Sequence, residues 1–386
     1  MDNIQLPTPV WGSHLSDVIL RLEKLRSPTL QGSVPAAVFF QLKSVFHMLE
    51  TLGSARIEGN HTTLADYVES KLDPANEEKQ VSDPQRELEN IEAAIEFIED
   101  TLTDEIPINR AFVSQLHQLI TTGLDPKEEG SANPGELRQI NVKIAQSQHT
   151  PPDVAILSEH FEALIELMNR EHSLSYQLLA VAIAHHRFAH IHPFDNGNGR
   201  VGRVLSYALL IKLGFNVKKG GRLMNPSAVF YTNRDSYYDR LSKADSLDDN
   251  DLLAWSEYYL DGLLDAILKV DRLLNRDYIE KQILLPAITK AKEFMRIGDR
   301  DFMILKYLIK QPSMSMKAEE LDQFGYKTSK QKSAVISRMK KADLITPTKP
   351  SGRIYTIKII GKGVLRDVIE ALKQEDFVPE FLEKNK

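Results

Sequence analysis

The chain has 386 residues, of which 42% are hydrophobic and 26% are charged. These values are ordinary for a soluble globular protein of two or three domains. The absence of cysteine excludes disulfide bonds, thiolate catalysis and cysteine–zinc sites. No apolar run reaches the roughly 20 residues that a membrane-spanning helix needs, and the first residues lack the pattern of a signal peptide. We therefore expect a cytoplasmic protein with no membrane partner.

The net charge of −6 is unevenly distributed along the chain. Residues 300–363 contain 14 Lys and Arg against 5 Asp and Glu, a net charge of +9, so the remaining residues carry −15. This difference predicts that the C-terminal part is a chemically distinct module.

The N-terminal region is predicted to be helical. An amphipathic stretch covers residues 15–25, and a stronger helix with apolar residues at helical spacing covers residues 35–57. Gly59 supplies a stop signal after this second helix. Glu58 projects from the end of the helix, and Ser54 lies one turn before it.

The middle of the chain also has helical periodicity, except for one segment. Between Glu136 and Ala145, the apolar residues Ile140, Val142 and Ile144 alternate with polar ones, which predicts a short strand or hairpin. Residues 74–84 are polar and predict an exposed connection. Helices are expected over residues 85–102, 109–124, 156–171, 175–190, 199–213, 250–274 and 278–295.

The stretch from Ala189 to Arg203, AHIHPFDNGNGRVGR, joins two of these helices through a glycine-rich loop. Backbone N–H groups and the positive end of a helix dipole can hold an anion at such a place. Arg200 and Arg203 add positive charge one helical turn apart. His192 stands where it can move a proton on a group that attacks a bound phosphate. The pattern therefore predicts a polyphosphate site with a general base beside it.

The pattern changes again from Asp301 onward. A helix is expected over residues 302–309, a short helix over 318–324, a basic helix over 328–342, and a hairpin over 344–359. This order is typical of a winged helix-turn-helix.

Three motifs in this chain resemble those of Fic-domain proteins. HPFDNGNGRVGR resembles the signature HxFx(D/E)GNGRxxR and contains both of its arginines, and it follows an HxxFxxI pattern formed by His185, Phe188 and Ile191. SARIEGN resembles the inhibitory (S/T)xxxE(G/N) motif of an N-terminal helix. PGELRQINVKI, from Pro134, resembles the flap over the active site. The layout is similar to that of bacterial Fic adenylyltransferases of the N-terminally inhibited type.

The resemblance implies a mainly α protein with a Fic helical core and a small β-hairpin flap. It further implies an N-terminal region with the inhibitory helix over residues 1–84, a Fic domain over 85–296, and a winged helix-turn-helix-like domain with a tail over 297–386.

The activity implied by the resemblance is AMP transfer from ATP to Ser, Thr or Tyr hydroxyls of target proteins and of the chain itself. Pyrophosphate is released, His192 is the catalytic base, and Mg²⁺ or Mn²⁺ is the metal. Glu58, with Ser54, is the inhibitory residue, and it would pair with Arg203 where the γ-phosphate of ATP would bind. The other implied site residues are Phe194, Gly197, Asn198, Gly199, Arg200, Arg203, Val229 and Tyr237 for ATP, and Ile140, Asn141 and Val142 for docking of the target on the flap.

Two positions depart from the family pattern. Asn196 occupies the position of the acidic metal ligand, and Asp195 precedes it. An amide oxygen brings no charge to Mg²⁺, so either Asn196 binds the metal weakly or Asp195 replaces it. Val229 stands where relatives commonly have Tyr, which leaves the adenine contacts open.

Several alternatives remain open at this point. Four histidines, His185, His186, His190 and His192, lie close together but lack the HExxH pattern of a metal hydrolase, and His185 and His190 are expected to pack or brace the loop. Another Fic reaction could transfer phosphocholine or phosphate. The chain could also be a DNA-binding regulator whose Fic core senses nucleotide. A second copy of the chain, as a homodimer, and DNA at the C-terminal domain are the further partners to consider.

Overall fold

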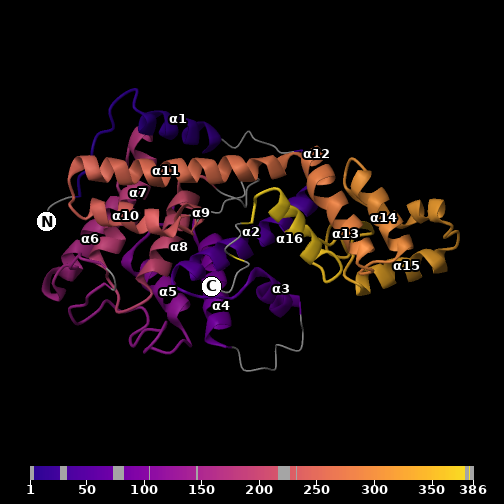
Figure 1. Ribbon diagram of the computed structural model, residues 1–386, viewed down its shortest axis with the longest axis horizontal. Coiled ribbons are helices and arrows are strands. Elements are labelled where there is room, and N and C mark those ends of the chain that lie inside the picture. Colours follow the sequence, from indigo (N-terminus) through magenta and orange to yellow (C-terminus); the bar gives the residue numbers. More distant parts are fainter. Residues whose placement is uncertain are drawn as a thin grey trace. The chain divides into compact units, whose positions relative to one another are not determined.

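The computed structural model describes residues 4–26, 33–72, 82–103, 105–144, 147–215, 227–231, 233–378 and 382. The described residues are mainly helical, with one three-stranded sheet (Figure 1). None of their helices is both long and apolar enough to cross a membrane. Most of the predicted connection over residues 74–84, and Ala145, lie outside the described residues.

The chain divides into two compact units. One contains Met1–Leu30, Glu50–Thr62 and Gln80–Leu268, and the other contains Gln31–Leu49, Thr63–Lys79 and Lys269–Lys386.

The first unit is built from helices, most of which the sequence predicts within a few residues at each end. Two helices, α9 and α10, were not predicted. The helices that lie wholly or partly in this unit are α1 (His14–Arg26), α2 (Ala36–Ile57), α4 (Asp83–Thr101), α5 (Arg110–Thr121), α6 (Val154–Asn169), α7 (Leu174–Ile191), α8 (Asn198–Lys212), α9 (Ala228–Tyr231), α10 (Arg234–Ala244) and α11 (Asp249–Asp271).

Helices α7 and α8 form the centre of this unit. They pack against each other, with α1 and α6 beside α7, and α4 and α5 beside α8. Every residue of α8 from Arg200 to Ile211 is buried. A helix that is buried on all sides needs an apolar surface all round, so the two arginines of α8 must be balanced by partners inside the unit.

Side-chain caps set where two of the neighbouring helices begin. The side chain of Asn109 accepts a hydrogen bond from Phe112 N at the start of α5. The side chain of Asp153 accepts one from Ala155 N at the start of α6. Each cap satisfies a backbone N–H that has no partner within its helix.

The predicted hairpin over residues 136–145 is not formed in the described part of that segment, which contains no strand. The guanidinium of Arg138 donates to the carbonyl oxygens of Ile140 and Pro152, at 3.0 and 2.5 Å. The side chain of Asn141 bonds to the start of α6. The carbonyl of Ile140 is satisfied by a side chain, and the N–H of Arg138 by the carbonyl of Pro193, rather than by a partner strand.

The second unit contains the three-stranded sheet and the remaining helices, together with the first part of α2. The predicted helices and hairpin are present, whereas β1, α3 and α16 were not predicted. The further elements are α3 (Leu64–Leu72), η2 (Arg272–Leu274), α12 (Arg276–Tyr278), the π-helix η3 (Ile279–Leu284), α13 (Leu285–Glu293), α14 (Asp299–Lys310), β1 (Ser315–Lys317), η4 (Ala318–Phe324), α15 (Ser329–Lys341), β2 (Ile345–Pro347), β3 (Ile354–Ile357) and α16 (Leu365–Gln374).

The sheet is antiparallel in the order β1-β3-β2, so β3 lies in the middle. Tyr355 pairs with Met316 on one side, and Thr356 pairs with Thr346 on the other. The basic helix α15 is tied to α14 by Arg338, whose guanidinium contacts both carboxylate oxygens of Asp301 at 2.5 and 2.6 Å. This bidentate pair fixes the orientation of α15 in the unit.

Candidate active site

The glycine-rich loop between α7 and α8 is a closed turn. The side chain of Asn198 accepts from Phe194 N and donates to Phe194 O, both at 2.9 Å. Gly197, with φ of 71°, begins α8 in the left-handed region, and a Cβ there would lie 3.0 Å from Thr121 Cγ2. This position therefore requires glycine. The Asn198 side chain thus fixes the shape of the loop at the N-terminus of α8.

Phe194 anchors the loop in the core and is fully buried. Its ring stacks on that of His117, with 3.8 Å between centroids. The Nδ1 atom of His117 accepts from Gly135 N at 2.8 Å, so its Nε2 donates to the carbonyl of Asn196 at 3.1 Å. Burial lowers the pKa of His117 to about 4, and the neutral ring joins the loop to the start of the flap.

Arg203 is paired with the end of α2. Its Nη2 lies 2.6 Å from Glu58 Oε1 and 3.1 Å from the carbonyl of Ser54, and its Nε donates to Ser54 Oγ at 2.9 Å. Arg203 is 1% exposed. Burial alone would raise the pKa of Glu58, but the Arg203 and Arg200 guanidiniums bring it below its ordinary value. The result is a charge-assisted pair inside the unit.

The carboxylate of Glu58 also covers the first turn of α8. A Cβ built on Gly199 would lie 2.1 Å from Glu58 Oε1, so only glycine permits this approach. Glu58 therefore lies where the helix N-terminus and Arg203 would otherwise attract a phosphate. Nη1 of Arg203 is buried and makes no hydrogen bond to any described atom, which leaves one donor available for a ligand.

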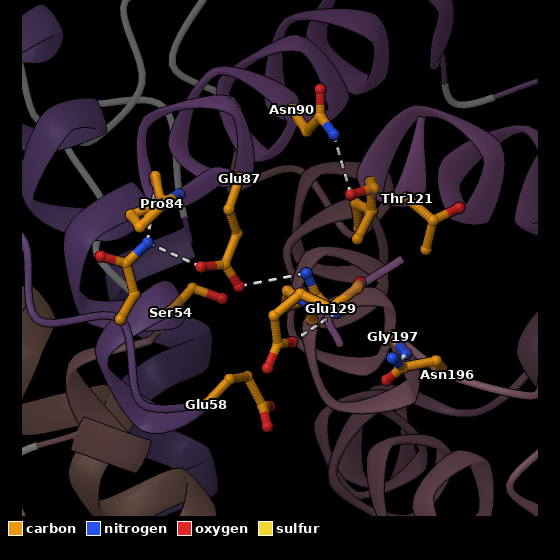
Figure 2. A network of polar contacts seen from close by, with 12 residues as sticks. Ser54, Glu58, Pro84, Glu87, Asn90, Thr121, Glu129, Asn196 and Gly197 are labelled. Atoms are coloured by element: carbon orange, nitrogen blue, oxygen red, sulfur yellow. Dashed lines mark hydrogen bonds and ion pairs between the residues drawn. The ribbon is translucent and has the colours of Figure 1, made fainter. Parts of the chain in front are cut away.

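Arg200 is held by two other carboxylates. Its Nη1 lies 3.1 Å from Glu87 Oε1, and its Nη2 lies 2.9 Å from Glu129 Oε2 and 2.7 Å from the Glu129 carbonyl. Asn60 donates to the other oxygen of Glu87 at 2.6 Å. Figure 2 shows Glu58, Glu87 and Glu129 entering the same region from three segments of the chain.

This arrangement changes the expectation for Arg200. The sequence predicts that both arginines hold the outer phosphates of ATP, but the guanidinium of Arg200 is occupied by Glu87 and Glu129, and Glu87 is itself buried. A buried ion pair is costly to break because it leaves an uncompensated charge. In this arrangement Arg200 is tied to Glu87 and Glu129, and Arg203 is tied to Glu58, so the phosphate roles of both arginines stay predictions.

His192, the residue predicted to be catalytic, lies directly after the last residue of α7. His192 has a left-handed backbone, with φ of 49°, and its N–H donates to Phe188 O. Its carbonyl accepts from Arg138 Nε at 2.9 Å. Burial lowers the pKa of His192 to about 4. The imidazole is neutral at pH 7 and can accept a proton.

The side chains predicted to bind Mg²⁺ do not fit that ion in this arrangement. The Asp195 carboxylate accepts from Ser131 Oγ, Ala132 N and Asn196 N, at 2.6 to 2.9 Å. Asn196 donates to Glu128 O at 2.6 Å, and its amide oxygen accepts from Gly197 N at 2.7 Å. Both side chains are committed to the loop itself, whereas Mg²⁺ requires oxygens in near-ideal octahedral geometry.

The two residues predicted on the nucleotide side are core residues here. Tyr237 is 3% exposed, and its hydroxyl lies 3.0 Å from His185 Nε2 within an aromatic cluster. Val229 is 6% exposed and packs against Gly262 of α11, where a Cβ would lie 3.0 Å from Val229 Cγ1. Neither side chain presents a surface to ATP without rearrangement. His185, as expected, braces the core.

The flap residues are accessible. Ile140 is 68% exposed, and Val142 is half-buried. Asn141 donates to Asp153 Oδ2 at 2.7 Å and accepts from Val154 N at 2.8 Å, so its side chain fixes the flap to α6. An apolar side chain at the edge of a site can contact an extended segment of another protein.

A model of a known protein family matches the part of the chain that contains this site. The model of the Fic/DOC family matches residues 107–210, which include the loop and both flanking helices. This part of the chain is therefore similar to proteins of the Fic/DOC family.

The curated relatives share this region. "Protein adenylyltransferase Fic" of Drosophila virilis is 33% identical over 176 residues, which is 44% of this chain and 33% of that protein. The protein of the same name from Aedes aegypti is 30% identical over 209 residues, which is 52% of this chain and 37% of that protein. The chain thus spans about a third of the length of these relatives.

Solved structures show the same fold. A Fic family protein from Desulfovibrio desulfuricans has a TM-score of 0.53 at 17% identity, covering 92% of this chain and 98% of that one. Fic-1 from C. elegans has a TM-score of 0.52 at 20% identity, covering 66% of this chain and 71% of that one.

Several residues that contact the loop between α7 and α8, or Arg200, were not predicted from the sequence. Glu87 and Glu129 carry no local motif, and only the three-dimensional fold brings them to Arg200. His117 is likewise a single residue within an ordinary periodic pattern. Arg138 does have a sequence signal, since it lies in the flap motif that the family resemblance identifies.

Glu50, on α2, is a further buried acid of the first unit. Its carboxyl accepts hydrogen bonds from the N–H of Ser227, at 3.0 Å, and from the Ser227 hydroxyl. Burial raises the pKa of Glu50 to about 7, although the hydrogen bonds and Arg203 lower it in part. Glu50 is therefore largely protonated below neutral pH, and Glu58 remains the ionised partner of Arg203.

Glu50→Gln should make the stability of the chain less dependent on pH. The pKa of Glu50 in the folded state, about 7, lies above its value in the unfolded state. Protonation of Glu50 therefore stabilises the folded chain fully below about pH 4.5. This contribution to the free energy of unfolding, about 3 kcal/mol, is lost as the pH rises through 7. Urea unfolding at pH 5 and pH 8 measures this. The native chain should lose more free energy of unfolding between the two pH values than Glu50→Gln, and equal losses would contradict the assignment.

Proposed function

We propose that this chain is a protein adenylyltransferase. It transfers AMP from ATP to the hydroxyl of a Ser, Thr or Tyr side chain in a target protein, or in the chain itself, and releases pyrophosphate. One observation carries the proposal: a neutral histidine, an N-terminal helix turn and a buried arginine surround the same loop, with an internal carboxylate in the anion position. The relatives named protein adenylyltransferase Fic support it.

The loop and Arg203 provide the charge that the phosphates need. Nucleotidyl transfer depends mainly on positioning and on neutralising charge that develops on phosphate oxygens. The backbone N–H groups at the start of α8, the helix dipole and the unpaired Nη1 of Arg203 supply these interactions. No step is assigned to a metal held by Asp195 or Asn196.

His192 is the proposed general base. Its neutral imidazole accepts the proton of the attacking hydroxyl while the hydroxyl oxygen forms a bond to the α-phosphorus. The bond from the α-phosphorus to the bridging oxygen breaks, and pyrophosphate leaves with that oxygen. Arg138 joins the flap to His192. Its Nε donates to the His192 carbonyl and its backbone N–H donates to Pro193 O at 2.9 Å, which fixes the position of the base relative to the flap.

Glu58 keeps the native chain at low activity in this proposal. A carboxylate and a γ-phosphate cannot occupy the same space over Gly199 and beside Arg203. ATP must therefore displace Glu58, or bind in a pose that does not place the α-phosphorus in line with the hydroxyl and the leaving group.

Glu58→Gly should increase AMP transfer. Removing the carboxylate frees Arg203, and a hydrogen bond to a charged group contributes about 1.5–3 kcal/mol, which corresponds to roughly a tenfold to hundredfold change in rate. Label transfer from ATP carrying ³²P at the α-phosphate measures the effect. Glu105→Gly, at an exposed loop position, is the matched control and should behave as the native chain does. Equal labelling of all three chains would reject the inhibitory role.

His192→Ala should abolish transfer in the Glu58→Gly background while ATP still binds. Loss of a general base costs roughly a hundredfold to ten-thousandfold in rate. His14→Ala, which removes an exposed histidine of α1, should leave the rate unchanged. Label transfer and calorimetric binding of ATP are measured on the same samples, and undiminished transfer by His192→Ala would exclude it as the base.

The position of the label separates AMP transfer from the other Fic reactions. Label from the α-phosphate but not from the γ-phosphate indicates AMP transfer. Label from the γ-phosphate alone would indicate phosphate transfer instead, and no label from either would favour the nucleotide-sensing regulator.

DNA binding by the proposed C-terminal domain, residues 297–386, is a second candidate function. The observation that favours it is the exposure of Lys330, Lys340 and Lys341 on α15, directly before the β2 and β3 strands. Clustered lysines can neutralise phosphates, and such binding weakens as the salt concentration rises. Gel shifts at two salt concentrations test it, and no shift at the lower concentration would exclude it.

A further inference from the structure

Three potential metal-binding side chains converge beside the nucleotide loop. His149 lies in the segment that follows the flap, His190 in the last turn of α7, and Asp245 directly after α10. Each offers one ligand atom, and these atoms all lie within 4.8 Å of one another. All three residues are half-buried, so an ion could reach them from solvent. Sequence analysis expected only a packing or bracing role for His190.

The spacing of the polar atoms is close to that of a shared coordination sphere. His190 Nδ1 lies 3.0 Å from Asp245 Oδ1, and the ligand atoms of His149, His190 and Asp245 all lie within 4.8 Å of one another. Two ligands of one tetrahedral Zn²⁺ ion, each about 2.1 Å from the metal, lie about 3.4 Å apart. Small side-chain movements would therefore bring the three ligand atoms around a single ion.

His149 is oriented in the way that metal-binding histidines usually are. Its Nε2 donates to the carbonyl of His190 at 2.8 Å, which leaves Nδ1 with the lone pair that a metal needs. Metal-binding histidines typically donate their second ring N–H to a carbonyl or carboxylate, which fixes the tautomer and the direction of the ring. The rings of His149 and His190 lie 4.0 Å apart, centroid to centroid. This end of the site is thus preorganised.

The ligand types of the three side chains suit a divalent transition metal. Imidazole nitrogen is a common ligand of first-row transition metals, and a carboxylate adds negative charge beside the ion. Asp245 Oδ1 accepts hydrogen bonds from His186 Nε2 and His190 Nδ1, so the carboxylate already faces both imidazoles.

We propose that His149, His190 and Asp245 bind one divalent transition-metal ion of the Zn²⁺, Co²⁺ or Ni²⁺ type. Two imidazoles and one carboxylate favour these metals over Mg²⁺, which prefers oxygen ligands. The ion would tie the segment after the flap to the end of α7 and to α10. Since His190 lies two residues before His192, and Tyr237 lies on α10, such an ion stabilises the framework around the catalytic base.

Titration of the chelator-treated, tag-free chain with Zn²⁺, followed by calorimetry, tests the proposal. Co²⁺ is used in parallel, because its visible absorption reports tetrahedral or five-coordinate nitrogen and oxygen ligation. We expect one ion per chain, together with a rise in the thermal unfolding temperature as the Zn²⁺ concentration increases.

Two variants and a control decide which residues hold the ion. His149→Gln and Asp245→Asn should each weaken Zn²⁺ binding at least tenfold and remove the Co²⁺ absorption, while His160→Gln, on α6, should bind as the native chain does. If Asp245→Asn does not fold, as judged by circular dichroism, His149→Gln is the deciding variant, because His149 lies outside the helices. Absence of binding to the native chain, or equal binding by His149→Gln and the native chain, would overturn the proposal.

Discussion

The arrangement of the first unit follows from placing two arginines inside a helix that is buried on every side. Arg200 and Arg203 are each 1% exposed, and a buried guanidinium is stable only with ionised or strongly polar partners. Those partners come from segments that are distant in sequence: Glu58 from the end of α2, Glu87 from α4, and Glu129 from the loop before the flap. The ion pairs that balance the two arginines therefore join these segments to α8, directly after the glycine-rich loop.

The two arginines are balanced in different ways, and the difference assigns their roles. Arg200 is held by two carboxylates, and one of them, Glu87, is buried and fixed by Asn60. Arg203 has a single carboxylate partner among the described residues, Glu58, whose side chain is 26% exposed and follows the last residue of a helix. A partner at a helix end can be displaced at lower cost than a buried pair. Under the proposed function, Arg203 is the arginine whose carboxylate partner a phosphate would displace.

Much of this arrangement could be predicted from the sequence, because it is local. The helices on either side of the loop follow from periodicity, and the glycines of the loop follow from a short motif. The pairing of Glu58 with Arg203, 145 residues apart, was expected only from the family resemblance. The partners of Arg200 could not be predicted, since Glu87 and Glu129 lie 113 and 71 residues away from it and belong to no motif. The hairpin predicted for the flap is absent from its described residues for a related reason. Alternation does not reveal that the Ile140 carbonyl bonds to the Arg138 side chain, or that the Arg138 N–H bonds to Pro193, instead of to a strand.

The central claim is that this site attaches AMP to protein hydroxyl groups and that Glu58 restrains it. The most direct measurement is the intact mass of the Glu58→Gly chain and of the native chain after incubation with ATP. We predict that Glu58→Gly gains the mass of one or more AMP groups, located by fragmentation on Ser, Thr or Tyr, while the native chain gains little. An unchanged mass in Glu58→Gly, in a sample that still binds ATP, would contradict the account.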